Sequence, residues 1–398
     1  MLTIEMIQDA KKVLEGVARQ TPLLSTTLIN PGSDVYIKCE NMQITGSFKL
    51  RGAYYKAANL TEEEAQHGIV ACSAGNHAQG VAYAAQKMGI ESVICMPAGA
   101  PLAKVEATKN YGAEVVLVPG VYDDAAAKAT ELQKKKGYTF LHPFNDPYVM
   151  AGQGTVGLEI VEQLEDVEVV LVPIGGGGLI SGIACAIKTL KPECKVYGVQ
   201  ALGAASMRNS IRDGKVETLS EVNTVADGIA VKQPGDKTFT AVQKYVDGIV
   251  TVTEEEIAAA ILHLLEKQKT VAEGAGAVSV AAAMFNKVDI IGKKTVCVIS
   301  GGNVDINILD RIIDKGLQVG GRLTDFSITI PDKPGQLTRM LQVIADADAN
   351  VFSINHDRVG KGVAVGKCKV DVTVETRNKE HYFEVIMDLK ENGYDISL

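Results

Sequence analysis

Short, continuous hydrophobic runs alternate with stretches of helical periodicity over about the first three hundred residues of the chain. The runs do not alternate between apolar and polar residues, which is typical of strands that helices cover on both faces. The pattern therefore predicts an α/β, doubly wound, mainly parallel sheet. The predicted strands are residues 69–73, 92–96, 114–119, 139–142, 168–174, 195–200 and 295–300. The predicted helices include residues 77–88, 123–136, 157–164 and 179–190.

The pattern changes after Gly320 and Gly321, which suggests a second, smaller domain. Residues 326–330 alternate as a half-buried strand, and the turn 331–335 leads into an amphipathic helix. The order β-α-β-β-α-β is the ferredoxin-like arrangement. We therefore expect domains at residues 1–320 and 321–398. The elements expected after the turn are the helix 336–347, strands 351–355 and 367–375, the helix 381–391 and a last strand 394–398.

Composition and charge narrow the possible partners. The 398 residues are 46% hydrophobic and 22% charged, an ordinary globular balance, and the net charge of −8 argues against nucleic acid as a partner. Residues 1–16 read as an amphipathic helix rather than a signal peptide. The seven cysteines are dispersed without a C-x-x-C pair, which suggests reduced thiols in a cytoplasmic protein and no zinc site.

One uncharged run, residues 169–187, is long enough to span a bilayer by length alone. Pro173 and the glycines at 175–178 lie within it and would break a spanning helix. We expect a buried strand, a glycine turn and a buried helix instead, and no membrane association.

The segment Gly46-Ser47-Phe48-Lys49-Leu50-Arg51-Gly52 places one lysine among small and apolar neighbours. Lysine normally stays at the surface, and a surface lysine after a turn is the ordinary interpretation. Burial would disfavour the ammonium form, lower the lysine pKa and make Lys49 a usable amine nucleophile.

A glycine turn, Gly175-Gly176-Gly177-Gly178-Leu179, follows a predicted strand and begins a helix. Consecutive glycines allow backbone N–H groups to converge on an anion, and the helix N-terminus favours negative charge. Phosphate is the expected ligand, although such a turn can also be purely structural. The dinucleotide pattern G-x-G-x-x-G is not met, because Ser181 stands at the third glycine position.

Ser73-Ala74-Gly75-Asn76-His77 lies at another junction between a strand and a helix. Its backbone amides could hold a carboxylate, and Asn76 could contact a phenolic oxygen. A plain helix N-cap formed by Ser73 or Asn76 is the alternative. His77 is expected to be structural or a contact residue.

Ser300-Gly301-Gly302-Asn303 ends a third strand, and the Ser300 hydroxyl could bond to a ring nitrogen. A simple Gly-Gly turn is the alternative. Glu273, in Ala272-Glu273-Gly274, is expected to be a solvated glutamate at a helix start.

Four features together indicate a pyridoxal-phosphate site. They are an activated lysine, a glycine turn that can bind phosphate, a hydroxyl for a ring nitrogen and a loop for a carboxylate. The chain resembles the fold-type II pyridoxal-phosphate enzymes, which are tryptophan synthase β-like, and among them the threonine ammonia-lyases (threonine dehydratases). The resemblance covers residues 1 to about 320 and rests on GSFKLRGA, ACSAGNHAQGVA, PIGGGGL, TVAEGAGA and ISGGN. It implies a two-lobed catalytic domain, with a small lobe at roughly residues 40–145 inserted in the large one.

The resemblance also implies the cofactor, pyridoxal 5'-phosphate, and the residues around it. Lys49 would bind the cofactor covalently and act as the catalytic base, with Phe48 beside the ring. Asn76 would contact the ring hydroxyl oxygen, Gly175, Gly176, Gly177, Gly178 and Leu179 the phosphate, and Ser300 the pyridine nitrogen. The backbone around Ser73, Gly75 and His77 would hold the substrate carboxylate.

Two departures separate the chain from the serine racemases, which share the fold. Ala74 stands where racemases carry a serine that acts on the opposite face of the substrate. Racemases also bind a divalent metal after the equivalent of strand 195–200, where this chain has Gln200, Ala204 and Ser206, a poor ligand set for a hard cation. We expect no metal there and elimination rather than racemisation.

The resemblance implies that L-threonine is deaminated to 2-oxobutanoate and ammonia. A serine-preferring dehydratase, a β-replacement enzyme and a non-catalytic amino-acid sensor remain alternatives. One substrate methyl group is worth only about 1–3 kcal/mol, so L-serine is also an expected substrate. The segment 330–337 resembles an ACT regulatory domain, which implies a small-molecule effector and a homodimer or homotetramer.

Overall fold

The computed structural model describes residues 2–26, 28–360 and 362–397, and it divides into two compact units, Met1–Asn307 and Ile308–Leu398. Met1 and Leu398, which the expected first helix and last strand include, lie outside the described residues.

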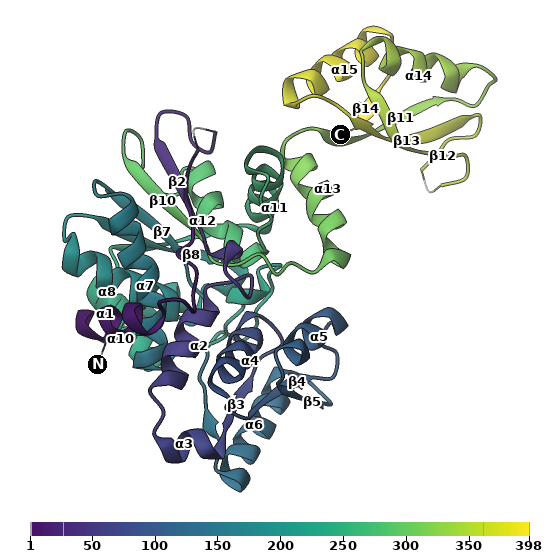
Figure 1. Cartoon of the computed structure of the whole chain (residues 1–398). Helices are drawn as coiled ribbons and strands as arrows, with labels where there is room; N and C mark the ends of the chain where they lie inside the picture. The colour runs from purple at the N-terminus through teal and green to yellow at the C-terminus, as the bar shows by residue number, and fades with distance from the viewer. Residues whose placement is uncertain (1, 27, 361, 398) are drawn as a thin grey trace. The chain divides into compact units, whose positions relative to one another are not determined.

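The first unit contains two sheets with helices packed around them (Figure 1). The larger sheet has the strand order β1-β2-β10-β7-β8-β9, and all neighbours are parallel except β1 and β2. Its strands are β1 (Leu23–Thr26), β2 (Asp34–Cys39), β7 (Val169–Pro173), β8 (Lys195–Ala201), β9 (Gly248–Val252) and β10 (Lys294–Ile299). The helices that accompany it are α1 (Ile4–Val13), α7 (Pro147–Gln163), α8 (Gly178–Leu190), α9 (Ser206–Asp213), α10 (Asp236–Tyr245), α11 (Glu254–His263) and α12 (Gly274–Met284).

The smaller sheet is entirely parallel and has the order β5-β4-β3-β6. Its strands are β3 (Ile69–Cys72), β4 (Ser92–Pro97), β5 (Glu114–Val118) and β6 (Thr139–Phe140). Its helices are α2 (Lys49–Ala58), α3 (Glu62–His67), α4 (Asn76–Met88), α5 (Leu102–Asn110) and α6 (Tyr122–Lys136). The segment expected to form an inserted lobe, residues 40–145, contains all four of these strands.

All seven strands predicted for the first three hundred residues occur, but three others were missed. β1 is half-exposed at the edge of the sheet, β2 carries the charged residue Lys38, and β9 is only partly buried. None of the three presents the continuous apolar run that identifies a strand buried on both faces.

Helix α7 is longer than predicted. Its glycines lower the helix propensity of the sequence, but the folded structure uses them for close helix packing. The predicted helix 157–164 covers only the second half of α7, which begins at Pro147 behind the N-cap Asp146. A Cβ atom added at Gly152 would lie 2.5 Å from the carbonyl oxygen of Arg51 in α2. The glycines therefore allow neighbouring helices to approach closely.

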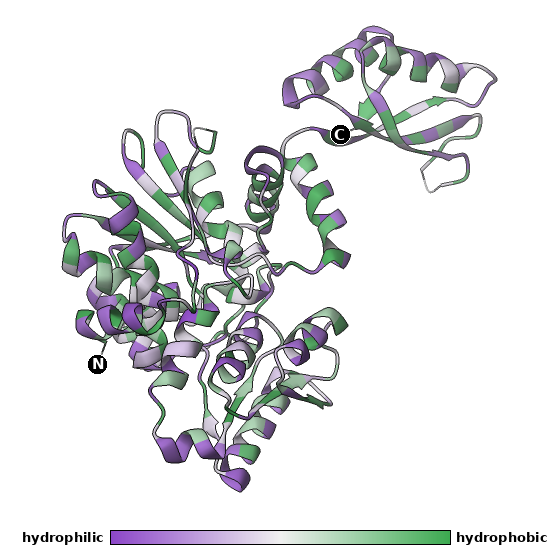
Figure 2. Ribbon diagram, in the orientation of Figure 1, coloured by the Kyte–Doolittle hydropathy of each residue, from purple (hydrophilic) through white to green (hydrophobic). Residues whose placement is uncertain are grey.

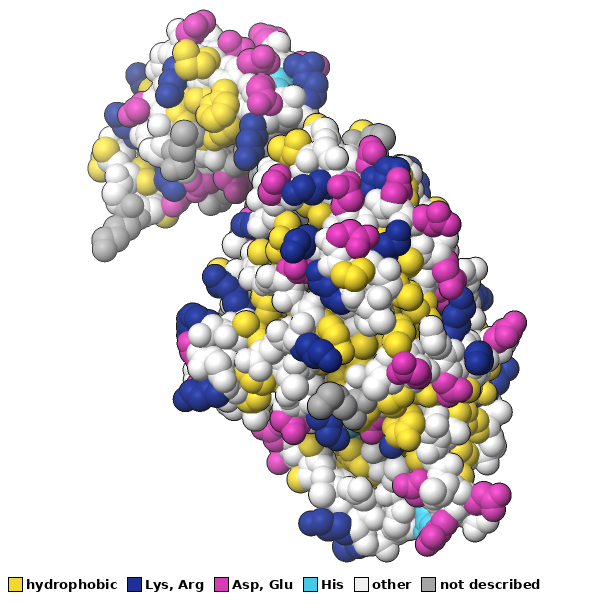
Figure 3. Space-filling model, turned by 90° about the vertical axis from the view of Figure 1, so that its left-hand side faces the viewer, with side chains coloured by type: hydrophobic (Ala, Val, Ile, Leu, Met, Phe, Trp, Pro, Cys, Tyr) yellow, Lys and Arg dark blue, Asp and Glu magenta, His cyan; other side chains and the backbone are white. Residues whose placement is uncertain are grey.

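The hydrophobic run 169–187 forms the buried strand β7, a glycine turn and the first part of the buried helix α8, as predicted. The hydrophobic core beneath α8 includes Ile180 and Ile183 together with Val170 and Val172 of β7. Within the described residues, no helix is both long and apolar enough to cross a membrane. On the face that Figure 3 shows, basic and acidic side chains are interspersed.

The second unit has a four-stranded antiparallel sheet in the order β12-β13-β11-β14. Hydrophobic and hydrophilic residues alternate along its strands (Figure 2), and its core lies between the sheet and two helices. The predicted ferredoxin-like order β-α-β-β-α-β is confirmed. Its elements are α13 (Leu309–Val319), β11 (Leu323–Pro331), α14 (Gln336–Asp346), β12 (Asn350–Asp357), β13 (Lys367–Glu375), α15 (Lys379–Glu391) and β14 (Ile396–Ser397).

The boundary between the two units differs from the one that the sequence suggested. The expected boundary followed residue 320, at the Gly320-Gly321 turn, whereas the structure divides before α13. Helix α13 packs against β11, and Ile312 of this helix is buried. A turn in the chain marks the end of a helix, but side-chain packing decides to which unit that helix belongs.

Candidate active site

Lys49 is the first residue of α2, and the loop before it is tied to the loop that follows β10. The backbone N–H of Phe48 donates to the carbonyl oxygen of Ser300 at 3.1 Å, and Ser47 forms an isolated β-bridge with Gly301. Two motifs that are about 250 residues apart in sequence therefore lie side by side.

The Lys49 side chain is partly buried, and its amine bonds to a backbone acceptor. Its Nζ donates to the carbonyl oxygen of Pro143 at 2.9 Å and lies 5.3 Å from the centroid of the Phe48 ring. Burial lowers the pKa of Lys49 to about 8, against the attraction of Glu273, which raises it. The interpretation of Lys49 as an ordinary surface lysine is wrong, because the side chain is partly buried and its amine is bound to a backbone carbonyl, and burial makes the amine easier to deprotonate.

The glycine turn between β7 and α8 has no room for side chains. Gly177 has φ +96°, and a Cβ atom there would lie 2.6 Å from Cε of Met207. At Gly176 the added atom would lie 2.4 Å from the ring of Phe144, and at Gly178 it would lie 2.9 Å from Cβ of the same residue. The first N–H groups of α8, which begins at Gly178, have no intrahelical partner and can bind an anion.

The segment that contains Pro143 and Phe144 links the lysine to the glycine turn. Pro143 accepts the Lys49 hydrogen bond, while the Phe144 ring lies against Gly176. Lys49 and the glycine turn therefore flank the same short stretch of chain.

Asn76, Glu273 and Asn303 form a chain of hydrogen bonds beside the Ser300 loop. Asn76 Nδ2 donates to Glu273 Oε1 at 2.7 Å, and Asn303 Nδ2 donates to Asn76 Oδ1 at 2.6 Å. A Cβ atom at Gly301 would lie 2.6 Å from Glu273 Oε1, so the carboxylate is packed directly on this loop. The alternative of Asn76 as a plain N-cap is wrong, because Asn76 is the first helical residue of α4 and its side chain bonds to Glu273 and Asn303.

Glu273 was expected to be a solvated glutamate, and this prediction is wrong because the side chain is buried. It is the N-cap residue of α12 and is only 4% exposed. Burial raises the pKa of Glu273 to about 7, and the nearby charge of Asp227 acts in the same direction. Sequence reasoning missed its burial, although a single acid among alanines and glycines was the available signal.

Ser73, Gly75 and His77 occupy the end of β3 and the start of α4, and Ser300 follows β10. The backbone N–H of Gly75 donates to Ser73 Oγ at 3.2 Å, and space is open around Gly75 because an added Cβ would meet nothing within 4 Å. His77 is buried, and its Nε2 bonds to the carbonyl oxygen of Leu141 at 2.9 Å. Ser300 is 2% exposed, beside Gly301.

Two histidines near the lysine are neutral at physiological pH. Burial, and then the charge of Lys49, lowers the pKa of His77 to about 3 and that of His142 to about 4. Nδ1 of His142 accepts hydrogen bonds from the backbone N–H groups of Phe144 and Asn145. Both rings therefore support the local backbone, and neither presents a charged acid to the site.

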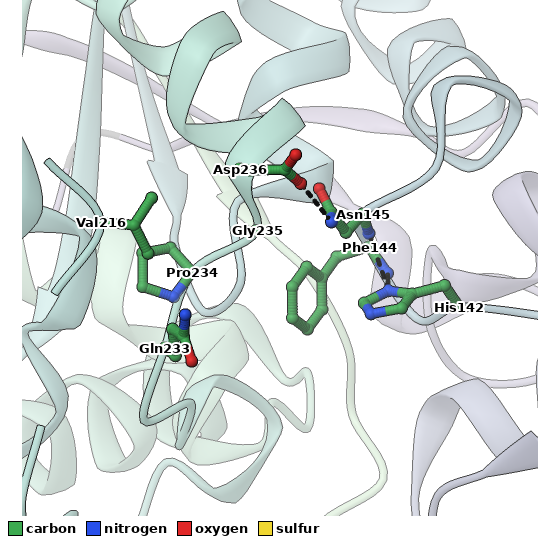
Figure 4. Close-up of a pocket in the computed structure, with 8 residues that line it drawn as sticks. All are labelled: His142, Phe144, Asn145, Val216, Gln233, Pro234, Gly235 and Asp236. Carbon is green, nitrogen blue, oxygen red and sulfur yellow. Dashed lines mark hydrogen bonds between the residues drawn. The ribbon is translucent and has the colours of Figure 1, made fainter. Parts of the chain in front are cut away.

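A cavity of about 380 Å³ opens next to the glycine turn (Figure 4). Asn145 Nδ2 donates to Asp236 Oδ1 at 2.7 Å in its wall. Lys49, Asn76 and Ser300 are not among its lining residues, so it adjoins the reactive groups rather than enclosing them. Its lining residues are His142, Phe144, Asn145, Val216, Gln233, Pro234, Gly235 and Asp236.

A buried network of four charged residues anchors the start of α2. Arg51, two residues after Lys49, bonds to Glu40 Oε2 through Nε at 2.8 Å and to Glu159 Oε1 through Nη1 at 2.5 Å. Lys38 Nζ completes the network by donating to Glu159 Oε2 at 2.6 Å. Local sequence patterns do not reveal this network, because its members come from separate segments of the chain, namely β2, the turn after it, α2 and α7.

Gln200 and Ser206, which the sequence suggests are poor ligands for a hard cation, make internal hydrogen bonds. Gln200 Nε2 donates to the carbonyl oxygen of Ala204 at 3.1 Å, and Gln200 Oε1 accepts from the backbone N–H of Arg208 at 2.8 Å. Ser206 Oγ donates to the carbonyl oxygen of Val231.

Known proteins are similar to this chain in both sequence and fold. Residues 14–302 match the family model described as pyridoxal-phosphate dependent enzyme. The chain belongs to this family. Its cofactor is pyridoxal 5'-phosphate, and it is an enzyme.

Individual relatives extend the comparison. The chain is 52% identical to the L-threonine ammonia-lyase of Thermotoga maritima over 100% of both chains. It resembles the processed form of threonine deaminase isoform 2 from Solanum lycopersicum, with a TM-score of 0.75 and 39% identity over 78% of this chain and 92% of that one. Maize serine racemase also has a TM-score of 0.75, with 35% identity over 80% of this chain and 98% of the racemase.

The residues of this pyridoxal-phosphate enzyme fit the cofactor chemically. The glycine turn leaves a backbone surface for a phosphate, since a Cβ atom at Gly176, Gly177 or Gly178 would lie within 3 Å of Met207 or Phe144. The Lys49 amine, with its lowered pKa, is suited to bind an aldehyde.

Proposed function

We propose that this enzyme deaminates L-threonine by β-elimination. The α-proton and the β-hydroxyl are lost as water, and the released enamine takes up water as it hydrolyses to 2-oxobutanoate and ammonia. The observation that carries the proposal is the lowered pKa of the Lys49 amine beside the Ser300 loop and the glycine turn. Similarity over the full chain to an L-threonine ammonia-lyase supports the choice of substrate. L-Serine is the expected second substrate, because a pocket that accepts a methyl group loses only about 1–3 kcal/mol when that group is absent.

Each residue then has a role. The backbone N–H groups from Gly175 to Leu179 bind the phosphate, the Asn76 amide contacts the phenolic oxygen, and the Ser300 hydroxyl bonds to the pyridine nitrogen. Phe48 packs beside the ring. When bound, pyridoxal phosphate withdraws electrons from the substrate α-carbon.

Lys49 is the base in this proposal. In its neutral form, the Nζ atom accepts the α-proton of the substrate, and the lowered lysine pKa makes that form available near physiological pH. The backbone around Ser73, Gly75 and His77 holds the substrate carboxylate. The open space at Gly75 is consistent with a ligand there.

The C-terminal unit is proposed to be an ACT-type regulatory domain that binds a small-molecule effector. Its ferredoxin-like sheet and its separate hydrophobic core support this assignment. Homo-oligomerisation and a cytoplasmic location stay predictions.

The test is a steady-state assay of the purified holoenzyme on L-threonine and L-serine, with chiral analysis of the remaining serine. We expect 2-oxobutanoate from threonine, pyruvate from serine and little D-serine, because Ala74 offers no hydroxyl on the opposite face. Lys49→Ala should abolish turnover, whereas Lys87→Ala, which removes an exposed lysine of α4, should leave it unchanged.

Covalent labelling tests the lysine assignment separately. Borohydride reduction should fix the cofactor to the peptide that contains Lys49. A label on another lysine would overturn the site assignment, and substantial D-serine would overturn the reaction type. Assays with isoleucine, valine and adenine nucleotides test for regulation.

A further inference from the structure

Three side chains with metal-binding atoms meet at one end of the C-terminal sheet. Asp332 directly follows β11, His356 lies near the end of β12, and Cys368 lies near the start of β13. One carboxylate oxygen, one imidazole nitrogen and the sulfur atom all lie within 4.8 Å of one another. The three residues are 36 or fewer positions apart, but no C-x-x-C pattern marks them.

The register of the sheet explains why they meet. Cys368 pairs with Ile330 of β11, and Val370, two residues later, pairs with His356 of β12. Alternate residues of a strand share a face, so Cys368 and Val370 lie on the side of the sheet that is packed on the core. The backbone N–H of Asp332 donates to the carbonyl oxygen of Gly366 at 2.9 Å, which holds the start of the turn beside β13.

The donor set favours one kind of cation. A thiolate, an imidazole and a carboxylate suit zinc, whereas sulfur is a poor ligand for Mg²⁺ or Ca²⁺. Tetrahedral zinc with bonds of roughly 2.0–2.3 Å needs ligand atoms about 3.3–3.7 Å apart, so small side-chain rotations would close the site. Three protein ligands leave a fourth position open for water or a small molecule.

The proposed ligands have other partners in the structure that a metal ion would have to displace. The Cys368 thiol donates to the carbonyl oxygen of Ile330, with the sulfur 3.7 Å from that oxygen, and loss of the thiol proton would end this hydrogen bond. Arg358 Nε lies 3.2 Å from Asp332 Oδ1, but the arginine side chain is 63% exposed, and exposed ion pairs contribute little. Burial, and then the charge of Asp332, raises the pKa of the Cys368 thiol, so a metal ion must displace its proton.

We propose that Asp332, His356 and Cys368 bind one Zn²⁺ ion in the C-terminal unit. The site adjoins the turn 331–335 before α14, so zinc would join β11, β12 and β13 at the end where this turn begins. The expectation that the cysteines form no zinc site rested on the missing C-x-x-C pattern, which cannot detect ligands brought together by sheet register. The proposal is independent of the proposed reaction.

The test uses the full-length holoenzyme, freed of metals and titrated with Zn²⁺ by calorimetry and with Co²⁺ by difference absorption. We expect one equivalent to bind, with release of about one proton from the thiol, and a cobalt–thiolate band. Cys368→Ser should abolish the band, and His356→Gln should weaken binding by about tenfold or more. His67→Gln and Cys194→Ser, which alter the other unit, should leave binding unchanged.

Arg358→Gln gives a result that misfolding cannot imitate. This variant removes the competitor for Asp332 at an exposed position, so it should bind Zn²⁺ several-fold more tightly. Cobalt binding without a thiolate band, or affinity unchanged in Cys368→Ser and His356→Gln, would overturn the site.

Discussion

The side-chain amide of Asn76 donates a 2.7 Å hydrogen bond to the carboxylate of Glu273, which lies 197 residues further along the chain. This bond joins the first residue of α4 to the N-cap residue of α12. The same carboxylate attracts the Lys49 amine and counters the fall in its pKa caused by burial. A residue proposed to contact the cofactor and the proposed base therefore share one buried acid.

Attachment of the cofactor to the apo chain should become faster as the pH rises, with a midpoint at about 8. The neutral amine is the nucleophile, and burial places the Lys49 pKa at about 8 instead of its usual 10.5. Stopped-flow absorption after mixing apo protein with pyridoxal phosphate measures this dependence. A midpoint near the pKa of an exposed lysine would contradict the burial argument.

Glu273→Gln should move that midpoint to a lower pH. The substitution keeps an acceptor for Asn76 but removes the negative charge that raises the pKa of Lys49. Glu131→Gln, at a partly exposed acid of α6 in the other sheet's helices, is the control and should leave the midpoint unchanged. An unchanged midpoint in Glu273→Gln would mean that the two charges do not interact.

Gly177→Ala should weaken cofactor binding by roughly tenfold or more, a loss of at least about 1.4 kcal/mol. The new Cβ would lie 2.6 Å from Cε of Met207 and would deform the turn proposed to hold the phosphate. Gly112→Ala is the control, because Gly112 also has positive φ, +82°, but an added Cβ there meets nothing within 4 Å. Equilibrium titration followed by absorption should show reduced affinity only for Gly177→Ala.

Arg51→Met should destabilise the first unit by about 3–5 kcal/mol. The substitution leaves Glu40 and Glu159 without their guanidinium partner in a buried setting, which costs far more than losing an exposed pair. Lys128→Met, which breaks the partly exposed pair with Glu131, should cost less than about 1 kcal/mol. Thermal unfolding of the two variants compares them directly, and equal losses would rule out the special role of the network.

A chain that ends at Asn307 should retain cofactor binding and threonine deamination but lose the response to an effector. The first unit contains every residue proposed to contact the cofactor or the substrate, while the second has its own core. Allostery requires a second site whose ligand binds two states unequally, and truncation removes that site. Activity assays with each candidate amino acid and nucleotide test this. A full response from the truncated enzyme would place the effector site in the first unit.

Gly335 offers a milder test of the same regulatory assignment. It has φ +82° at the N-cap of α14, where a side chain would strain the turn although space is open around it. Gly335→Val should blunt the effector response while unregulated activity stays near that of the unaltered enzyme.

The sequence by itself determined the local chemistry of this enzyme. The motifs around Asn76, Ser300 and the glycine turn directly follow strands that the runs of apolar residues identify, whereas Lys49 follows a longer loop after β2, a strand that the apolar pattern missed. Parallel strands of one sheet bring their carboxyl ends to one edge, which favours a meeting of the glycine turn and the Ser300 motif, whereas Asn76 follows a strand of the other sheet. The alternating pattern of the C-terminal strands predicted the ferredoxin-like order for the same local reason.

Only the tertiary structure decided which groups are buried and paired. Glu273 was expected in solvent, yet packing against Gly301 buries it and raises its pKa. Arg51 meets Glu159 across 108 positions of sequence, and Asp332 approaches Cys368 through the register of the sheet. The local hydrophobic periodicity of the sequence shows which face of a helix or strand is apolar. The desolvation of a charge depends on which distant segments surround it, and that information arises only when the chain is folded.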